Sequence, residues 1–128
     1  MYIDFVYPSV LEYRHTEIVK ILAPLAEHPN TPTSDGETPI YMAASKGHTE
    51  IVKILAPLAE HPNTPISDGN TPINVAAEKR HLEIVKFLVD LTDSHLGLQA
   101  AINAATRNGH MEIVQLLESF KQTARGSE

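Results

Sequence analysis

Apolar and polar positions alternate with the period of an α-helix after four histidines of this chain. The four segments begin at His15, His48, His81 and His110, and each places apolar residues on one helix face. The first three starts are 33 residues apart, and the last follows after 29. A fixed period of this length is typical of stacked helical repeats. The pattern therefore predicts an all-α solenoid built from helix-turn-helix units.

Each unit is predicted to begin with a turn and a short first helix. In the second unit, Asp35 and Gly36 are typical of a tight turn, because Asp bonds nearby backbone and Gly tolerates positive φ. Thr38 is a suitable N-cap, and Pro39 suits the first helical position. Gly47 is expected to end this helix.

A second helix is predicted after His48, and it carries the apolar face of the unit. Pro57 lies inside its pattern. Because proline removes a helical hydrogen bond and clashes with the preceding turn, we expect the helix to end or kink near Leu55–Ala56. An extended loop then leads to the next turn, Ser67-Asp68-Gly69.

These units resemble the ankyrin repeat. The resemblance is carried by Asp35-Gly36-Glu37-Thr38-Pro39-Ile40, Ala43-Ala44 and Gly47-His48 before Glu50-Ile51-Val52-Lys53, with equivalents at Asp68–Ile73, Ala76-Ala77 and Gly109–Val114. It implies an all-α ankyrin-repeat solenoid with projecting β-turn or hairpin loops. The expected repeats are residues 1–33, 34–66, 67–98 and 99–122, the first and last acting as divergent caps, and 123–128 are expected to form a flexible tail.

The chain departs from the family pattern at its histidine and glycine positions. The family histidine that ties neighbouring repeats is replaced by Tyr41, Asn74 and Asn103. The glycine before the recurrent histidine is Arg14 or Arg80 in two units. The family's histidine bond is therefore not expected here.

The junction between the third and fourth units is four residues shorter than the others and lacks an Asp-Gly turn. A truncated hairpin is therefore predicted between Val89 and Gln99. Ala100-Ala101 replaces Thr-Pro, so the fourth unit is expected to start without a cap.

The net charge of the chain indicates that nucleic acid is not its partner. Lys and Arg total 10 against 16 Asp and Glu, and the formal net charge is −6. Nucleic-acid binding depends on clustered basic residues, so nucleic acid is not the expected partner. No apolar run approaches the roughly 18 residues of a membrane span, and no signal peptide is recognisable. A soluble protein of the cytoplasm or nucleus is expected.

No residue pattern points to catalysis or to a bound cofactor. Without cysteine, disulfides, thiolate zinc sites and cysteine nucleophiles are excluded. The recurrent histidines would lie roughly 10 Å apart in a solenoid, too far to share a metal with bonds of about 2 Å. They are interpreted as packing and hydrogen-bonding residues. We expect a chain that is not an enzyme and that holds no metal or cofactor.

The two best copies, residues 15–47 and 48–80, are identical at 27 of 33 positions. All six differences fall in the turn and the first helix, which line the concave binding face of ankyrin stacks. The resemblance therefore implies a protein–protein interaction module that binds through this face, with Tyr41 and Arg107 of the types common in hot spots. The candidate residues are Thr33, Glu37, Tyr41, Ser45, Lys46, Ile66, Asn70, Asn74, Glu78, Lys79, Asn103 and Arg107.

Two further hypotheses concern other parts of the chain. Tyr2, Phe5 and Tyr7 either cover the stack as a divergent cap or form an exposed edge that self-associates, as in a fragment of a longer array. A monomer is favoured over a homo-oligomer. The resemblance also implies that the loop asparagines Asn30 and Asn63 are substrates of an asparaginyl hydroxylase.

Overall fold

The computed structural model describes residues 37–59, 62–91 and 95–126, with side chains described for 97–121 of the last range. This part of the chain is helical and contains no strand. The helices are α3 (Pro39–Lys46), α4 (Thr49–Leu55), the 3₁₀ turn η2 (Ala56–Leu58), α5 (Pro72–Glu78), α6 (Leu82–Val89), α7 (His95–Arg107) and α8 (Met111–Gly126).

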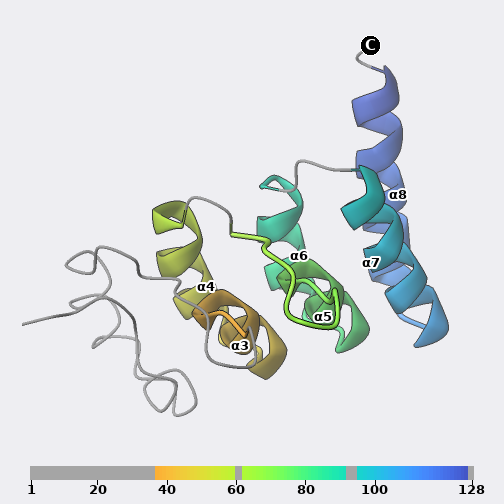
Figure 1. Ribbon diagram of the computed structural model, residues 1–128. Coiled ribbons are helices and arrows are strands. Elements are labelled where there is room, and N and C mark those ends of the chain that lie inside the picture. The colour runs from red at the N-terminus through yellow and green to blue at the C-terminus, as the bar shows by residue number, and fades with distance from the viewer. Residues whose placement is uncertain (1–36, 60–61, 92–94, 127–128) are drawn as a thin grey trace, which may run out of the picture.

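The helices form two layers (Figure 1). The first helices α3, α5 and α7 pack side by side, and the second helices α4, α6 and α8 form a parallel row behind them. Each first helix also packs against the second helix of its own unit. The predicted all-α solenoid of helix-turn-helix units is therefore confirmed for the described residues.

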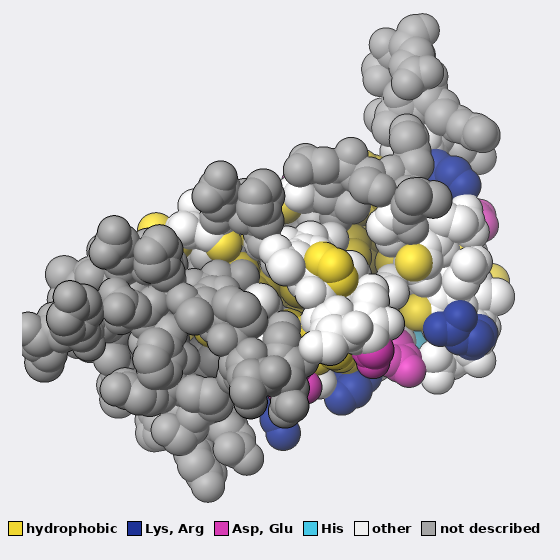
Figure 2. Space-filling model, viewed as in Figure 1, with side chains coloured by type: hydrophobic (Ala, Val, Ile, Leu, Met, Phe, Trp, Pro, Cys, Tyr) yellow, Lys and Arg dark blue, Asp and Glu magenta, His cyan; other side chains and the backbone are white. Residues whose placement is uncertain are grey.

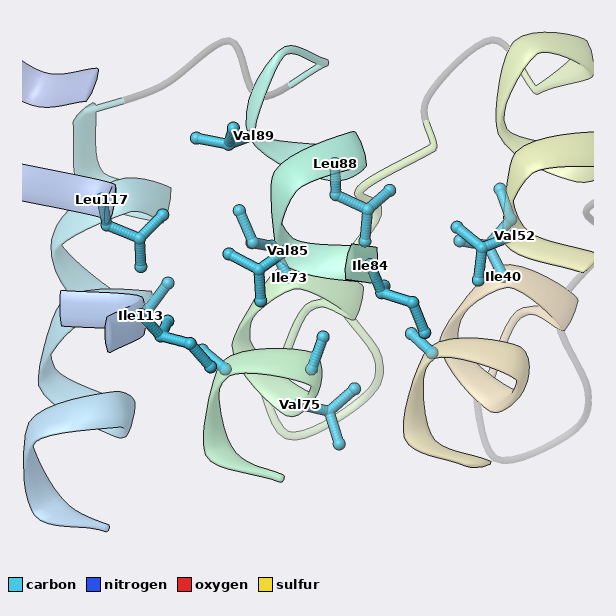
Figure 3. Packing of buried hydrophobic residues seen from close by; sticks show 14 of the residues in the cluster. Ile40, Val52, Ile73, Val75, Ile84, Val85, Leu88, Val89, Ile113 and Leu117 are labelled. Atoms are coloured by element: carbon cyan, nitrogen blue, oxygen red, sulfur yellow. The ribbon is translucent and has the colours of Figure 1, made fainter. Parts of the chain in front are cut away.

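The core lies between the two layers and continues from unit to unit. In α6, Ile84 and Leu88 point toward the preceding unit, while Val85 and Val89 point toward α8 (Figure 3). All four side chains are buried. Burial of each such side chain stabilises the fold by about 1.5–3 kcal/mol. The wide apolar face of the second helix is needed because it contacts two neighbours.

The predicted caps of the first helices are confirmed. Thr38 Oγ1 accepts a hydrogen bond from Tyr41 N at 3.1 Å, and Thr71 Oγ1 accepts one from Asn74 N at 3.2 Å. Proline follows the cap in each of these helices. Each cap satisfies a backbone N–H that has no partner within the helix.

The predicted end of the second helix is also confirmed. Helix α4 ends at Leu55, and the chain continues as the 3₁₀ turn that contains Pro57. The third unit has Asp90 at the equivalent position, and α6 continues to Val89. The proline therefore shortens only the earlier of these two helices.

The fourth unit differs from the expected start at residue 99. Helix α7 begins at His95 and crosses the predicted boundary, so Ala100-Ala101 lies inside a helix and not at its start. The residue before His95 lies outside the described residues, so the expected lack of a cap stays a prediction. Residues 92–94, which connect Leu91 to this helix, lie outside the described residues, so the truncated hairpin stays a prediction. At the other end, α8 continues to Gly126 and includes residues 123–126 of the expected tail.

Candidate functional site

The turn before α5 projects from the row of first helices. Ile66 N donates to Asn70 O at 2.7 Å, and Gly69 N donates to Ile66 O at 2.9 Å. Asp68 Oδ1 accepts a hydrogen bond from Asn70 N at 3.0 Å, as expected for an Asp at a turn. Gly69 has a φ of 88°, which is why glycine suits this position. These hydrogen bonds stabilise the turn, whose tip, Ser67-Asp68-Gly69, is exposed.

Tyr41 lies beneath this turn and joins two units. Asn70 Nδ2 donates to the Tyr41 hydroxyl oxygen at 3.1 Å, and the tyrosine side chain is only 8 % exposed. Burial raises the pKa of the Tyr41 hydroxyl above its usual value. The carboxylates of Asp68, Glu37 and Glu78 raise this pKa further, while the Asn70 hydrogen bond lowers it. The ring of Tyr41, which is one of the predicted partner-binding residues, is therefore part of the hydrophobic core.

The ends of the first helices are tied to the following units by two further contacts. Lys79 Nζ donates to Ser45 Oγ at 2.9 Å, and His81 Nε2 lies 3.3 Å from the carbonyl oxygen of Ser45. His110 repeats the contact one unit later, with Nε2 at 2.9 Å from the Glu78 carbonyl. A carbonyl only accepts, so each Nε2 carries a proton. The interpretation of the recurrent histidines as hydrogen-bonding residues is confirmed for these two.

The turn between first and second helix requires a left-handed residue in each described unit. Gly47 and Gly109 have φ values of 77° and 72°, and Arg80 takes the same conformation at 65°. The backbone bond across the turn is unchanged, since His81 N donates to Ala76 O at 2.9 Å. The sequence pattern identifies Arg80 as a departure from the family glycine, although the predicted surface does not include it. Its place at a glycine position was the available signal.

Polar side chains cover the outer face of the last unit. Gln99 Nε2 donates to Asn103 Oδ1 at 3.0 Å, and Lys121 Nζ from α8 donates to Gln99 Oε1 at 2.6 Å. Asn103 occupies the repeat position of Tyr41, whose hydroxyl bonds the next unit. The side chains of the last unit therefore make among themselves the polar contacts that an inner unit makes with its neighbour.

The candidate surface is divided by exposure. The exposed members are Lys46, Glu78, Lys79, Asn103 and Arg107, and the half-buried members are Glu37, Ser45, Ile66, Asn70 and Asn74. Figure 2 shows side chains of both charges along its lower edge, over α3, α5 and α7. The exposed candidates therefore lie on the row of first helices. Thr33 lies outside the described residues.

The candidates for other roles are only partly described. Asn63 is half-buried, and its Oδ1 accepts a hydrogen bond from Ile73 N at 3.1 Å. It thus secures the loop to α5, and its hydroxylation stays a prediction. Asn30 and the aromatic residues Tyr2, Phe5 and Tyr7 lie outside the described residues.

Neither metal ligands nor a membrane span is found in this part of the chain. Within residues 37–59, 62–91 and 95–126, no group of three or more His, Asp or Glu side chains could hold a metal ion. None of the helices described there is long and apolar enough to cross a membrane.

Paired helices, a shared core and bonds from one unit to the next define a helical repeat protein. A family model for ankyrin repeats (3 copies) matches residues 9–97, more than half of the chain. The chain belongs to the ankyrin-repeat family. Ankyrin repeats are generally protein–protein interaction modules and are typically non-catalytic. A comparison with curated proteins finds no match.

Proposed function

We propose that this chain is a non-catalytic protein-binding module whose partner binds the first helices and the 66–70 turn. One observation carries this proposal. The helices α3, α5 and α7 pack side by side, and each contributes exposed polar or charged side chains to the same row. Such a surface offers varied contacts on a rigid support, which favours binding without a large change in shape.

The second helices are less suited to recognition. Their exposed faces carry the same pairs in the second and third units, with Lys53 Nζ 3.9 Å from Glu50 Oε1 and Lys86 Nζ 3.5 Å from Glu83 Oε1. A surface that repeats in this way offers a partner little to distinguish one unit from the next. The first helices differ between the same units, and this variation supports their role in specificity.

Two matched double variants test this surface. Short peptides are selected from a random display library with the full chain, and their affinities are measured by calorimetry. Lys46→Ala with Lys79→Ala removes two exposed lysines at the C-terminal ends of the first helices α3 and α5, and Lys53→Ala with Lys86→Ala removes two from the second helices. We expect about tenfold weaker binding for the first pair and about twofold or less for the second. The reverse order would refute the proposed surface.

A further inference from the structure

Arg80 occupies a backbone conformation that disfavours any residue with a Cβ atom. Its φ is 65°, and the glycines at the same repeat position on either side have 77° and 72°. Residues other than glycine rarely adopt this left-handed region. The copies that contain Gly47 and Arg80 are identical at 27 of 33 positions, so this exchange is one of few. The fold itself therefore gives no reason for an arginine here.

Arg80 lies among other basic side chains at the ends of the first helices. Lys46 and Arg107 are the last residues of α3 and α7, and Lys79 and Arg80 follow α5. All four are exposed, and we call them the basic row. A basic residue near a helix C-terminus is favoured by the helix dipole. That effect accounts for Lys46, Lys79 and Arg107 but does not require a second cation in the glycine position.

We infer that Arg80 binds a carboxylate of the partner, and that the partner segment facing the basic row is acidic. The inference rests on the proposed function, because it names the chemistry of that partner. A guanidinium group holds a carboxylate through two parallel hydrogen bonds, which lysine does not provide. Backbone strain at an exposed charged residue is typical of functional positions.

A nucleic acid fits this surface less well than an acidic protein segment. The chain has a formal net charge of −6, and the exposed carboxylate of Glu78 lies beside Lys79 and Arg80 in the sequence. A continuous phosphate backbone is repelled by such a charge distribution. A peptide with separated carboxylates can contact the arginine and lysines while avoiding Glu78.

The test combines stability and binding in the same variant. Arg80→Gly restores the residue that the backbone favours, so its unfolding equilibrium constant in urea should fall about fivefold. Its affinity for the peptides selected by the full chain should nevertheless fall about tenfold. Gain of stability with loss of binding is not expected for a residue that serves only the fold. Lys86→Ala, with an exposed lysine on α6, is the control and should change binding about twofold or less.

The peptides themselves separate the two proposals. Selected peptides rich in Asp and Glu that lose affinity when these are changed to Asn and Gln support the inference. Peptides that are not acidic, or that bind Arg80→Gly normally yet weaken with Lys46→Ala and Lys79→Ala, overturn the inference and leave the proposed function standing. If no peptide is selected, or if only duplex DNA or anionic vesicles bind, both are refuted.

Discussion

The second and third units have the same helix caps and the same internal packing. Their contacts with the unit that follows, here called joints, differ. Their caps, Thr38 and Thr71, make the same bond, and their second helices bury equivalent residues. The differences lie where the first helix meets the next unit. Tyr41 has a hydrogen-bond partner in Asn70, whereas the buried Oδ1 of Asn74 finds none among the described residues.

Some of the positions that differ between the two copies contact the neighbouring unit. Asn70 differs between the copies and bonds Tyr41, which also differs, and Gly47 is close to the ring of His81 in the next unit. In the last unit Gln99 occupies the repeat position of Asn70, and its Nε2 donates to Asn103 Oδ1 at 3.0 Å. Divergence at these positions therefore follows the neighbouring unit as well as any partner. Exposed differences such as Glu78 and Arg80 are better evidence of recognition.

We expect the largest loss of stability when Tyr41 is replaced by asparagine, the residue at the equivalent position 74 of the other copy. Tyr41→Asn removes a side chain that is 8 % exposed together with its bond to Asn70. We expect a loss of about 3 kcal/mol in the free energy of unfolding, measured in urea. Asn74→Tyr is the control, because position 74 is half-buried, and it should change stability by about 1 kcal/mol or less. Equal losses in the two variants would show that the joints are equivalent.

The next largest loss of stability is expected when Gly47 of the second unit is replaced by alanine. A Cβ atom at Gly47 would lie 2.9 Å from His81 Cε1, and the ring is held by its bond to the Ser45 carbonyl. At Gly109, with nearly the same φ, no atom lies within 4 Å of that position. Gly47→Ala should therefore cost about 2 kcal/mol and Gly109→Ala about 1 kcal/mol, measured by thermal and urea unfolding. A difference near zero would mean that the histidine ring moves freely.

Local chemistry made much of the fold predictable from the sequence. The cap at Thr38, the helix end before Pro57 and the left-handed Gly47 follow from rules that act within a few residues. The start of α7 was not predictable in this way, because Gly97 lies inside it and disfavours a helix. Burial of Leu98 at 3 % exposure shows that packing decides there.

The candidate site was less predictable than the fold. The repeat pattern located the row of first helices, and five of its predicted residues are exposed. It did not predict that Tyr41 is buried, since its partner Asn70 is 29 residues away and is present in only one of the joints. Contacts of this kind depend on which unit follows, and the composition of a single unit does not contain that information.

Alkaline pH should reveal the smallest difference between the two units. The pKa of Tyr41 is raised in the folded chain, chiefly by burial, so the unfolded chain loses this proton first. The contribution of Tyr41 to stability is therefore complete below its ordinary pKa of 10.0 and is lost as the pH rises through the higher folded value. Tyr41→Phe should cost about 1 kcal/mol at neutral pH through loss of the Asn70 bond. It should also flatten the fall in unfolding free energy above pH 10, whereas Asn74→Ala, which removes no ionisable group, should leave that slope unchanged. If the unfolding free energy of Tyr41→Phe falls as steeply above pH 10 as that of the unchanged chain, other groups cause the pH dependence. Tyr41 would then not be the pH-sensitive residue of this joint.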